Sequence, residues 1–138
     1  MSTVKELAKK YKSYTYDELL ARAKKDCEIL LPVFHRIALD GNGKPYVVIF
    51  MCGALASDGR LAEREYRFVK DLLDIGKEEV DRLVGGPRAE KAMTIADRIF
   101  DSCKDNIKSV LVDLCLCFAA ADNNIENKEI EFIARLLA

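Results

Sequence analysis

A pattern that occurs twice, 64 residues apart, limits what this chain can fold into more than any other feature. The stretch ASDGRLAEREYRFV at positions 56–69 is matched by AADNNIENKEIEFI at positions 120–133. Each copy follows a long apolar segment, contains a tight turn, and continues with an apolar stripe at helical spacing. Seven residues are identical between the copies at this offset: Val48, Ala56, Asp58, Glu65, Phe68, Leu72 and Leu73. Positions 46–73 and 110–137 therefore predict two copies of a helical hairpin, related by approximate twofold symmetry.

Apolar residues recur at helical spacing over the rest of the chain as well, and strand-like alternation is missing. We therefore expect an all-α fold, a compact helical bundle. The expected helices cover positions 3–12, 15–31, 32–39, 45–57, 62–75, 78–84, 88–103, 106–121 and 126–138. Two of them, 45–57 and 106–121, are almost entirely apolar beyond their first turn and should lie at the centre. A chain of 138 residues is expected to form a single domain over 1–138, with about residues 1–25 as an N-terminal helical extension.

Short-range signals mark several helix ends. Thr15 and Glu18 have the spacing of a capping box, in which each side chain accepts a hydrogen bond from the other residue's backbone. Pro32 either kinks its helix or starts a new segment. The turn residues at 40–43 predict a break, and Pro45 suits the first turn of the helix that follows.

Each copy of the repeat places a glutamate on its apolar stripe. Glu65 lies four residues after Leu61 and three before Phe68, and Glu129 is its counterpart in the second copy. A carboxylate on a buried face is costly unless it is hydrogen-bonded, paired or bound to a cation. One interpretation is local, because a glutamate at the third helical position can reach back to a free N–H group at the helix start. The other interpretation is a divalent cation site.

The cation interpretation rests on Asp58 and Asp122, each of which precedes a glutamate by seven residues, as in the second half of an EF-hand loop. The first half of such a loop is missing, because its leading ligand positions fall on alanines in the first copy. One loop alone offers too few oxygens for a hard cation. A metal site would therefore be shared between the loops, with Asp58, Glu65, Asp122 and Glu129 as ligands. The local and the shared interpretation both remain open.

Other residues that could carry chemistry have weaker patterns. His35 is the only histidine and lies in an apolar stretch, so we expect a packed histidine and not a general base. The five cysteines form no regular framework and are typical of small hydrophobic residues in a reducing compartment. Asp113 interrupts an apolar helix and is predicted to be a satisfied core acid, with a polar pocket as the alternative. Because no nucleophile has an evident base, we expect no catalytic residues and no enzyme.

The doubled motif, ASDGRLAERE at 56–65 and AADNNIENKE at 120–129, resembles the TerB-like tellurite-resistance family over roughly residues 30–138. The resemblance implies a bacterial, cytoplasmic, all-α protein with internal pseudo-symmetry, associated with tellurite and stress responses and with metal-ion involvement. It also implies that the acidic positions of the family fall on Asp58, Glu65, Asp122 and Glu129. Asn123 is a departure, since the family usually has glycine after the aspartate.

Net charge and hydropathy narrow the function classes further. A formal net charge of -1 gives no global attraction to nucleic acid, and the apolar runs are shorter than the roughly 20 residues that span a bilayer. We therefore expect no nucleic-acid partner and no membrane span. The expected function is that of a non-enzymatic, stress-associated accessory or binding protein. We expect this protein to bind a divalent cation through its paired acidic loops, to need no other cofactor, and to have a protein partner. The alternative is a protein–protein interaction module whose Asp and Glu loops are purely structural.

Overall fold

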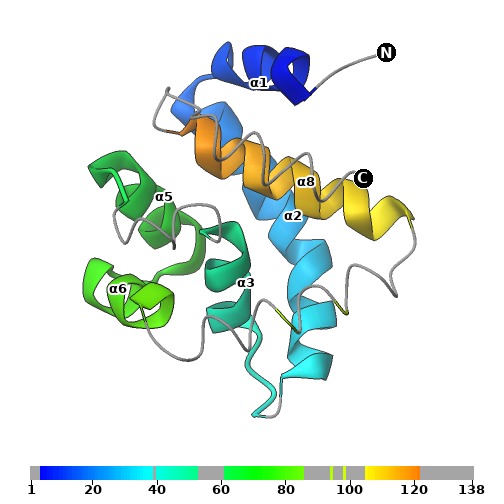
Figure 1. The fold of residues 1–138 in the computed structure, drawn as a ribbon, viewed down its shortest axis with the longest axis vertical. Helices are drawn as coiled ribbons and strands as arrows, with labels where there is room; N and C mark the ends of the chain where they lie inside the picture. Colours follow the sequence, from blue (N-terminus) through cyan, green and yellow to red (C-terminus); the bar gives the residue numbers. More distant parts are fainter. Residues whose placement is uncertain are drawn as a thin grey trace.

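The computed structural model describes residues 4–38, 40–52, 61–85, 94, 98 and 105–121 (Figure 1). Every regular element within these ranges is an α-helix, which confirms the predicted all-α class for the described residues. The helices are α1 (Val4–Lys12), α2 (Tyr16–Ile37), α3 (Lys44–Met51), α5 (Glu63–Leu73), α6 (Lys77–Gly85) and α8 (Asp105–Ala120). The helices predicted at 88–103 and 126–138 fall outside the described residues, apart from Thr94 and Arg98. None of the described helices has the length and apolar character needed to cross a membrane.

Helix α2 begins at the predicted capping box. The Thr15 hydroxyl accepts a hydrogen bond from the Glu18 backbone N–H at 3.2 Å, and the Glu18 carboxylate accepts one from the Thr15 N–H at 2.9 Å. The helix then continues through Pro32 to Ile37, so a new segment starting at Pro32 was a wrong expectation. Leu30 and Phe34, on either side of the proline, are both buried in the core, and their packing holds the helix together across it.

A tight turn at 40–43 joins α2 to α3, as the sequence predicts. The Asp40 side chain accepts a hydrogen bond from the Asn42 N–H at 3.0 Å. Gly43 lies so close to α2 that a Cβ atom on it would be 2.5 Å from the Phe34 Cβ and 2.7 Å from the His35 backbone nitrogen. The Gly43 N–H also donates to Nδ1 of His35 at 2.7 Å. The turn therefore requires glycine for space, and it uses His35 as an acceptor, in keeping with a structural role for this histidine.

The core lies between α2, α3, α5 and α8. Helix α8 packs most extensively against α2, while α1 lies across one end of this pair and α3, α5 and α6 lie to one side of it (Figure 1). Helices α3 and α8 are buried along most of their length, so the prediction of two central apolar helices is confirmed for their described parts. Phe68 of α5 meets Phe118 of α8 edge to face, with ring centroids 6.2 Å apart, and Tyr16 of α2 contacts Phe68 in the same way at 5.8 Å.

The predicted repeat is described only in part. The turn of each copy and the second helix of the 110–137 copy lie outside the described residues. Their first helices, α3 and α8, are both buried, and the identical pair Val48 and Val112 is buried in each. The pseudo-twofold relation between the copies stays a prediction.

Candidate functional site

Glu65, the described member of the four predicted metal ligands, is turned toward its own helix. Its Oε1 accepts a hydrogen bond from the Ala62 N–H at 2.7 Å, just before α5 begins, and the side chain is buried with 5 % of its surface exposed. This is the reach-back contact that the local interpretation predicts. The other three predicted ligands, Asp58, Asp122 and Glu129, lie outside the described residues. Their approach to Glu65 therefore stays a prediction.

A second set of acidic side chains, separate from the predicted loop ligands, lies where α1, α2 and α8 meet. Asp113 is at the centre of this set. Its Oδ1 accepts a hydrogen bond from Arg22 Nη2 at 2.7 Å and another from the Tyr11 hydroxyl. The same Arg22 nitrogen donates to the Tyr11 hydroxyl at 3.2 Å, and the guanidinium lies 5.3 Å from the centroid of the Tyr11 ring. Asp113 is thus the satisfied acid that the sequence predicts, and its partners tie three helices together.

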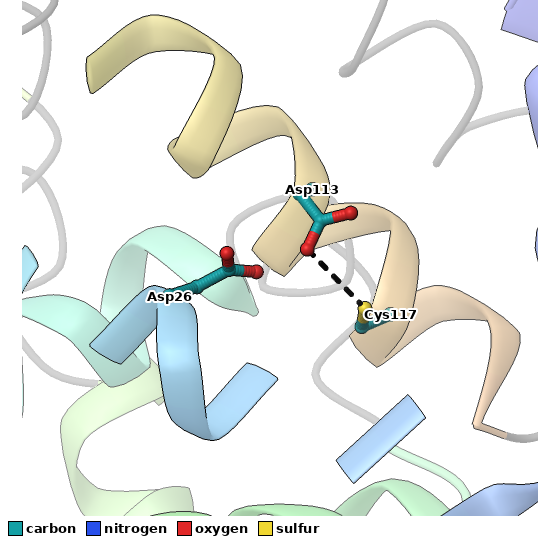
Figure 2. A group of neighbouring side chains, drawn as sticks. All are labelled: Asp26, Asp113 and Cys117. Atoms are coloured by element: carbon teal, nitrogen blue, oxygen red, sulfur yellow. Dashed lines mark hydrogen bonds between the residues drawn. The ribbon is translucent and has the colours of Figure 1, made fainter. Parts of the chain in front are cut away.

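Asp26 of α2 faces Asp113, and its carboxyl group points toward that of Asp113 (Figure 2). It is buried with 8 % of its surface exposed, and among the described residues no group donates a hydrogen bond to its Oδ2 atom. Cys117, one turn after Asp113 on α8, completes the group and directs its thiol at Asp113 Oδ2 across 3.8 Å. One ligand atom from each of these three residues lies within 4.8 Å of the others. We call Asp26, Asp113 and Cys117 the acid–thiol cluster.

The pKa values of Asp26 and Asp113 are shifted in opposite directions. Burial, reinforced by the hydrogen bond and the negative charge of Asp113, raises the pKa of Asp26 to about 9, against the opposing charge of Arg22. Burial also acts to raise the pKa of Asp113, but hydrogen bonds from Asp26, Tyr11 and Arg22 outweigh it and lower that pKa. Two facing carboxylates next to a single guanidinium leave an excess of negative charge. The buried Asp26 oxygen therefore needs either a proton or a cation.

The cluster opens into a pocket of about 450 Å³ between α1, α2 and α8. Asp26 and Asp113 line it together with Tyr11 and Arg22, and its remaining walls are mainly apolar side chains of α1 and α8. The polar pocket expected as the alternative environment of Asp113 is therefore present. Cys117 is fully buried and is not part of the lining, so a solute entering from the pocket meets the carboxyl groups first.

Sequence reasoning identified Asp113 but missed Asp26. Asp26 follows Lys24 and Lys25, and such a charged run is typical of a solvated helix face. A usable signal was present, because Asp26 lies three residues after Ala23 and four before Leu30, on the buried stripe of α2. An acid on an apolar stripe is the same feature that identified Glu65.

The described thiols are buried and free: Cys27, Cys52, Cys115 and Cys117. Burial is the largest cause of the raised pKa of each of them, and it contributes most to the pKa of about 12 of Cys27. Three of them pack as the small hydrophobic residues that the sequence predicts. Cys117 differs, because it also contacts a carboxylate.

Comparison with known proteins adds no relative: no protein-family model, no curated protein and no solved structure matches the chain. The TerB-like resemblance therefore stays a resemblance, carried by the motifs at 56–65 and 120–129.

Proposed function

We propose that this protein is a non-enzymatic, stress-associated accessory protein that acts by binding a divalent cation, as its TerB-like motifs imply. The observation that carries the proposal is the buried Oδ2 of Asp26, which faces a second carboxyl group and has no hydrogen-bond donor in the described part of the chain. Burying a carboxylate in this way is costly unless a positive charge compensates it. A cation reaching the pocket would supply that charge.

A difference between the two predicted repeat copies also supports a binding site at Asp26 and Asp113. At the offset of the repeat, Asp113 in α8 corresponds to Ile49 in α3, and Ile49 is fully buried. We propose that positions 46–73 and 110–137 are pseudo-twofold copies, as the sequence pattern predicts. In such a pair, Ile49 shows that an aliphatic residue is sufficient to pack the core at this position. Asp113 at the matching position then serves a purpose other than packing.

The test is a cation panel on metal-stripped wild-type protein. Calcium, magnesium, manganese and zinc ions are each added, and thermal unfolding is followed by circular dichroism. An ion at about 100 times its dissociation constant stabilises the folded state by about 2.7 kcal/mol, which raises the melting temperature by several degrees. If none of the four ions changes the melting temperature, the cation-binding function is wrong.

A second candidate function is a protein–protein interaction module with structural acidic loops. The hydrogen bond from Ala62 to Glu65 favours it, because this glutamate is already used at its helix start. Ile29 of α2 adds an exposed apolar side chain, with 47 % of its surface accessible. This candidate predicts that Glu65→Gln leaves both stability and every ion response unchanged, and that a partner protein loses affinity when Ile29 is replaced by lysine.

A further inference from the structure

We infer that Asp26, Asp113 and Cys117 form a binding site for a divalent transition-metal ion that accepts a sulfur ligand, with zinc as the leading example. The inference rests on the proposed cation-binding function and names both the ligands and the class of ion. It assigns the ion to a place that the repeated acidic loops do not include. Calcium and magnesium are the ions it excludes.

Two independent observations carry the site. The first is convergence, because one oxygen from each carboxyl group and the Cys117 sulfur lie within 4.8 Å of one another. The second is the Asp26 oxygen, which is buried, has no donor among the described residues, and belongs to a side chain directed at Asp113 (Figure 2). A cluster of acids alone would not point to a ligand, but a buried acceptor without a donor calls for a positive charge beside it, either a proton or a cation.

The separation of two of the donors, Asp113 and Cys117, is close to that around a small tetrahedral ion. Zinc lies about 2.1 Å from carboxylate oxygens and about 2.3 Å from cysteine sulfur, so tetrahedral geometry separates such an oxygen and sulfur by about 3.6 Å. The distance from Cys117 Sγ to Asp113 Oδ2 is 3.8 Å. The two atoms therefore need to move by only a few tenths of an ångström to share an ion.

The composition of the donor set separates the classes of ion. Calcium takes six to eight oxygen ligands and magnesium an octahedron of oxygens, whereas zinc accepts sulfur and oxygen in a four-coordinate site. Two carboxyl groups and one thiol fall well short of an oxygen cage. They provide three of the four zinc ligands, and the pocket that reaches Asp26 and Asp113 leaves room for a water or a small solute as the fourth.

Two residues next to the acid–thiol cluster, Tyr11 and Arg22, hold the carboxylate of Asp113 in an orientation suited to a metal ion. Tyr11 and Arg22 both donate to Oδ1 of Asp113, which fixes the carboxylate and leaves Oδ2 directed toward Cys117. Contacts of this kind orient ligands in metal sites. The charges also balance, because two carboxylates and a thiolate beside one guanidinium sum to -2, and a divalent ion neutralises that sum. Two protons pass to solvent as the ion binds, one from the Cys117 thiol and one from the Asp26 carboxyl group, whose raised pKa keeps it protonated at neutral pH without the ion.

The test uses the full chain, stripped of metal and titrated with zinc by calorimetry and with cobalt(II) by absorption spectroscopy. Wild type should bind one zinc ion, and cobalt(II) should give a sulfur-to-metal charge-transfer band. Cys117→Ala should abolish that band, and Cys117→Ala and Asp26→Asn should each weaken zinc binding at least about 100-fold, since each removes a direct ligand. The matched control is Cys115→Ala, which deletes a buried thiol from the same helix outside the cluster and should leave both signals intact. Circular dichroism of each variant verifies that it is folded.

The outcomes separate this inference from the proposed function. If zinc binds but binding survives Cys117→Ala and Asp26→Asn and is lost in Glu65→Gln, the cation function stands and this site is wrong. If calcium or magnesium stabilises the protein and zinc does not, the same conclusion holds. A wild-type chain that responds to no ion overturns both. Equal weakening by Cys115→Ala and Cys117→Ala would show that the effect comes from helix packing and not from ligation.

Discussion

Tyr11 donates a hydrogen bond to Asp113 across 102 residues of sequence, from the first described helix to the last. Arg22 of α2 joins the same contact, and its guanidinium also lies over the Tyr11 ring. The N-terminal segment, which the family resemblance leaves outside, is therefore part of the wall of the candidate site. This contact makes the helix α1 a structural component of the cluster and not an independent appendage.

Tyr11→Phe should destabilise the protein by about 1 kcal/mol, because it removes the hydrogen bond to Asp113 and keeps the ring. Urea unfolding followed by circular dichroism measures the change. Tyr14→Phe is the control, since the Tyr14 ring lies 5.4 Å from the same Arg22 guanidinium while the bond to Asp113 comes from Tyr11. Similar losses in both variants would contradict a specific role for the Tyr11 hydroxyl.

Gly43→Ala should destabilise the protein by about 1–3 kcal/mol, because the new methyl group would overlap backbone atoms of Phe34 and His35 that cannot rotate away. The matched control is Gly76→Ala, where no atom lies within 4 Å of the added Cβ. That variant should lose less, roughly 0.5 kcal/mol, because Gly76 precedes α6 at the N-cap position, where alanine is somewhat less favourable than glycine. Thermal and urea unfolding of the pair measure the difference, and equal behaviour would show that the turn moves away from α2 at little cost.

Glu65→Ala should destabilise the protein by about 1 kcal/mol, because the Ala62 N–H at the start of α5 loses its acceptor. Glu65→Gln should be mild, since the amide oxygen can accept the same hydrogen bond. Glu63→Gln, an exposed change in the same helical turn, serves as the control for altered charge near the helix start. A large loss in Glu65→Gln would mean that the negative charge itself is required, which favours the cation interpretation of the acidic loops.

The charge of Glu18 should stabilise the protein in a pH-dependent way. Hydrogen bonds from the Thr15 backbone and side chain lower the pKa of Glu18 below 4.5. Because the pKa is lower in the folded state, the stabilisation is fully present above pH 4.5. It is lost as the pH falls through the pKa that Glu18 has in the folded protein. Urea unfolding of wild type and Glu18→Gln between neutral and acidic pH measures it. The difference between the two should shrink on acidification, and a constant difference would contradict the prediction.

Local signals in the sequence predict local structure well. The capping box at Thr15 and Glu18 and the reach-back of Glu65 involve residues three apart, so helical spacing alone determines which groups meet. The apolar content of α3 and α8 likewise identifies the central helices. Pro32 is the exception, because packing on both of its sides overrides its local preference.

The candidate site was harder to predict, because its contacts are distant in sequence. Arg22 and Asp113 are 91 residues apart, and helical periodicity shows which face of each helix is buried but not which helices meet. Asp113 was recognisable as an acid that needs a partner, yet its partners lie on helices whose pairing only the fold determines. Asp26 was recognisable by the same criterion and was obscured by the lysines before it.

The contact between Tyr11 and Asp113 also gives the molecule an internal optical reporter. The chain contains no tryptophan and five tyrosines, so its ultraviolet emission comes from tyrosine alone. A carboxylate that accepts a hydrogen bond from the phenol quenches that emission, and any ligand that draws electron density from Asp113 relaxes the quenching. Occupancy of the pocket can therefore be followed as a change in the native fluorescence of the unlabelled protein, with Tyr11→Phe as the blank in which this change is lost while the other four tyrosines still emit.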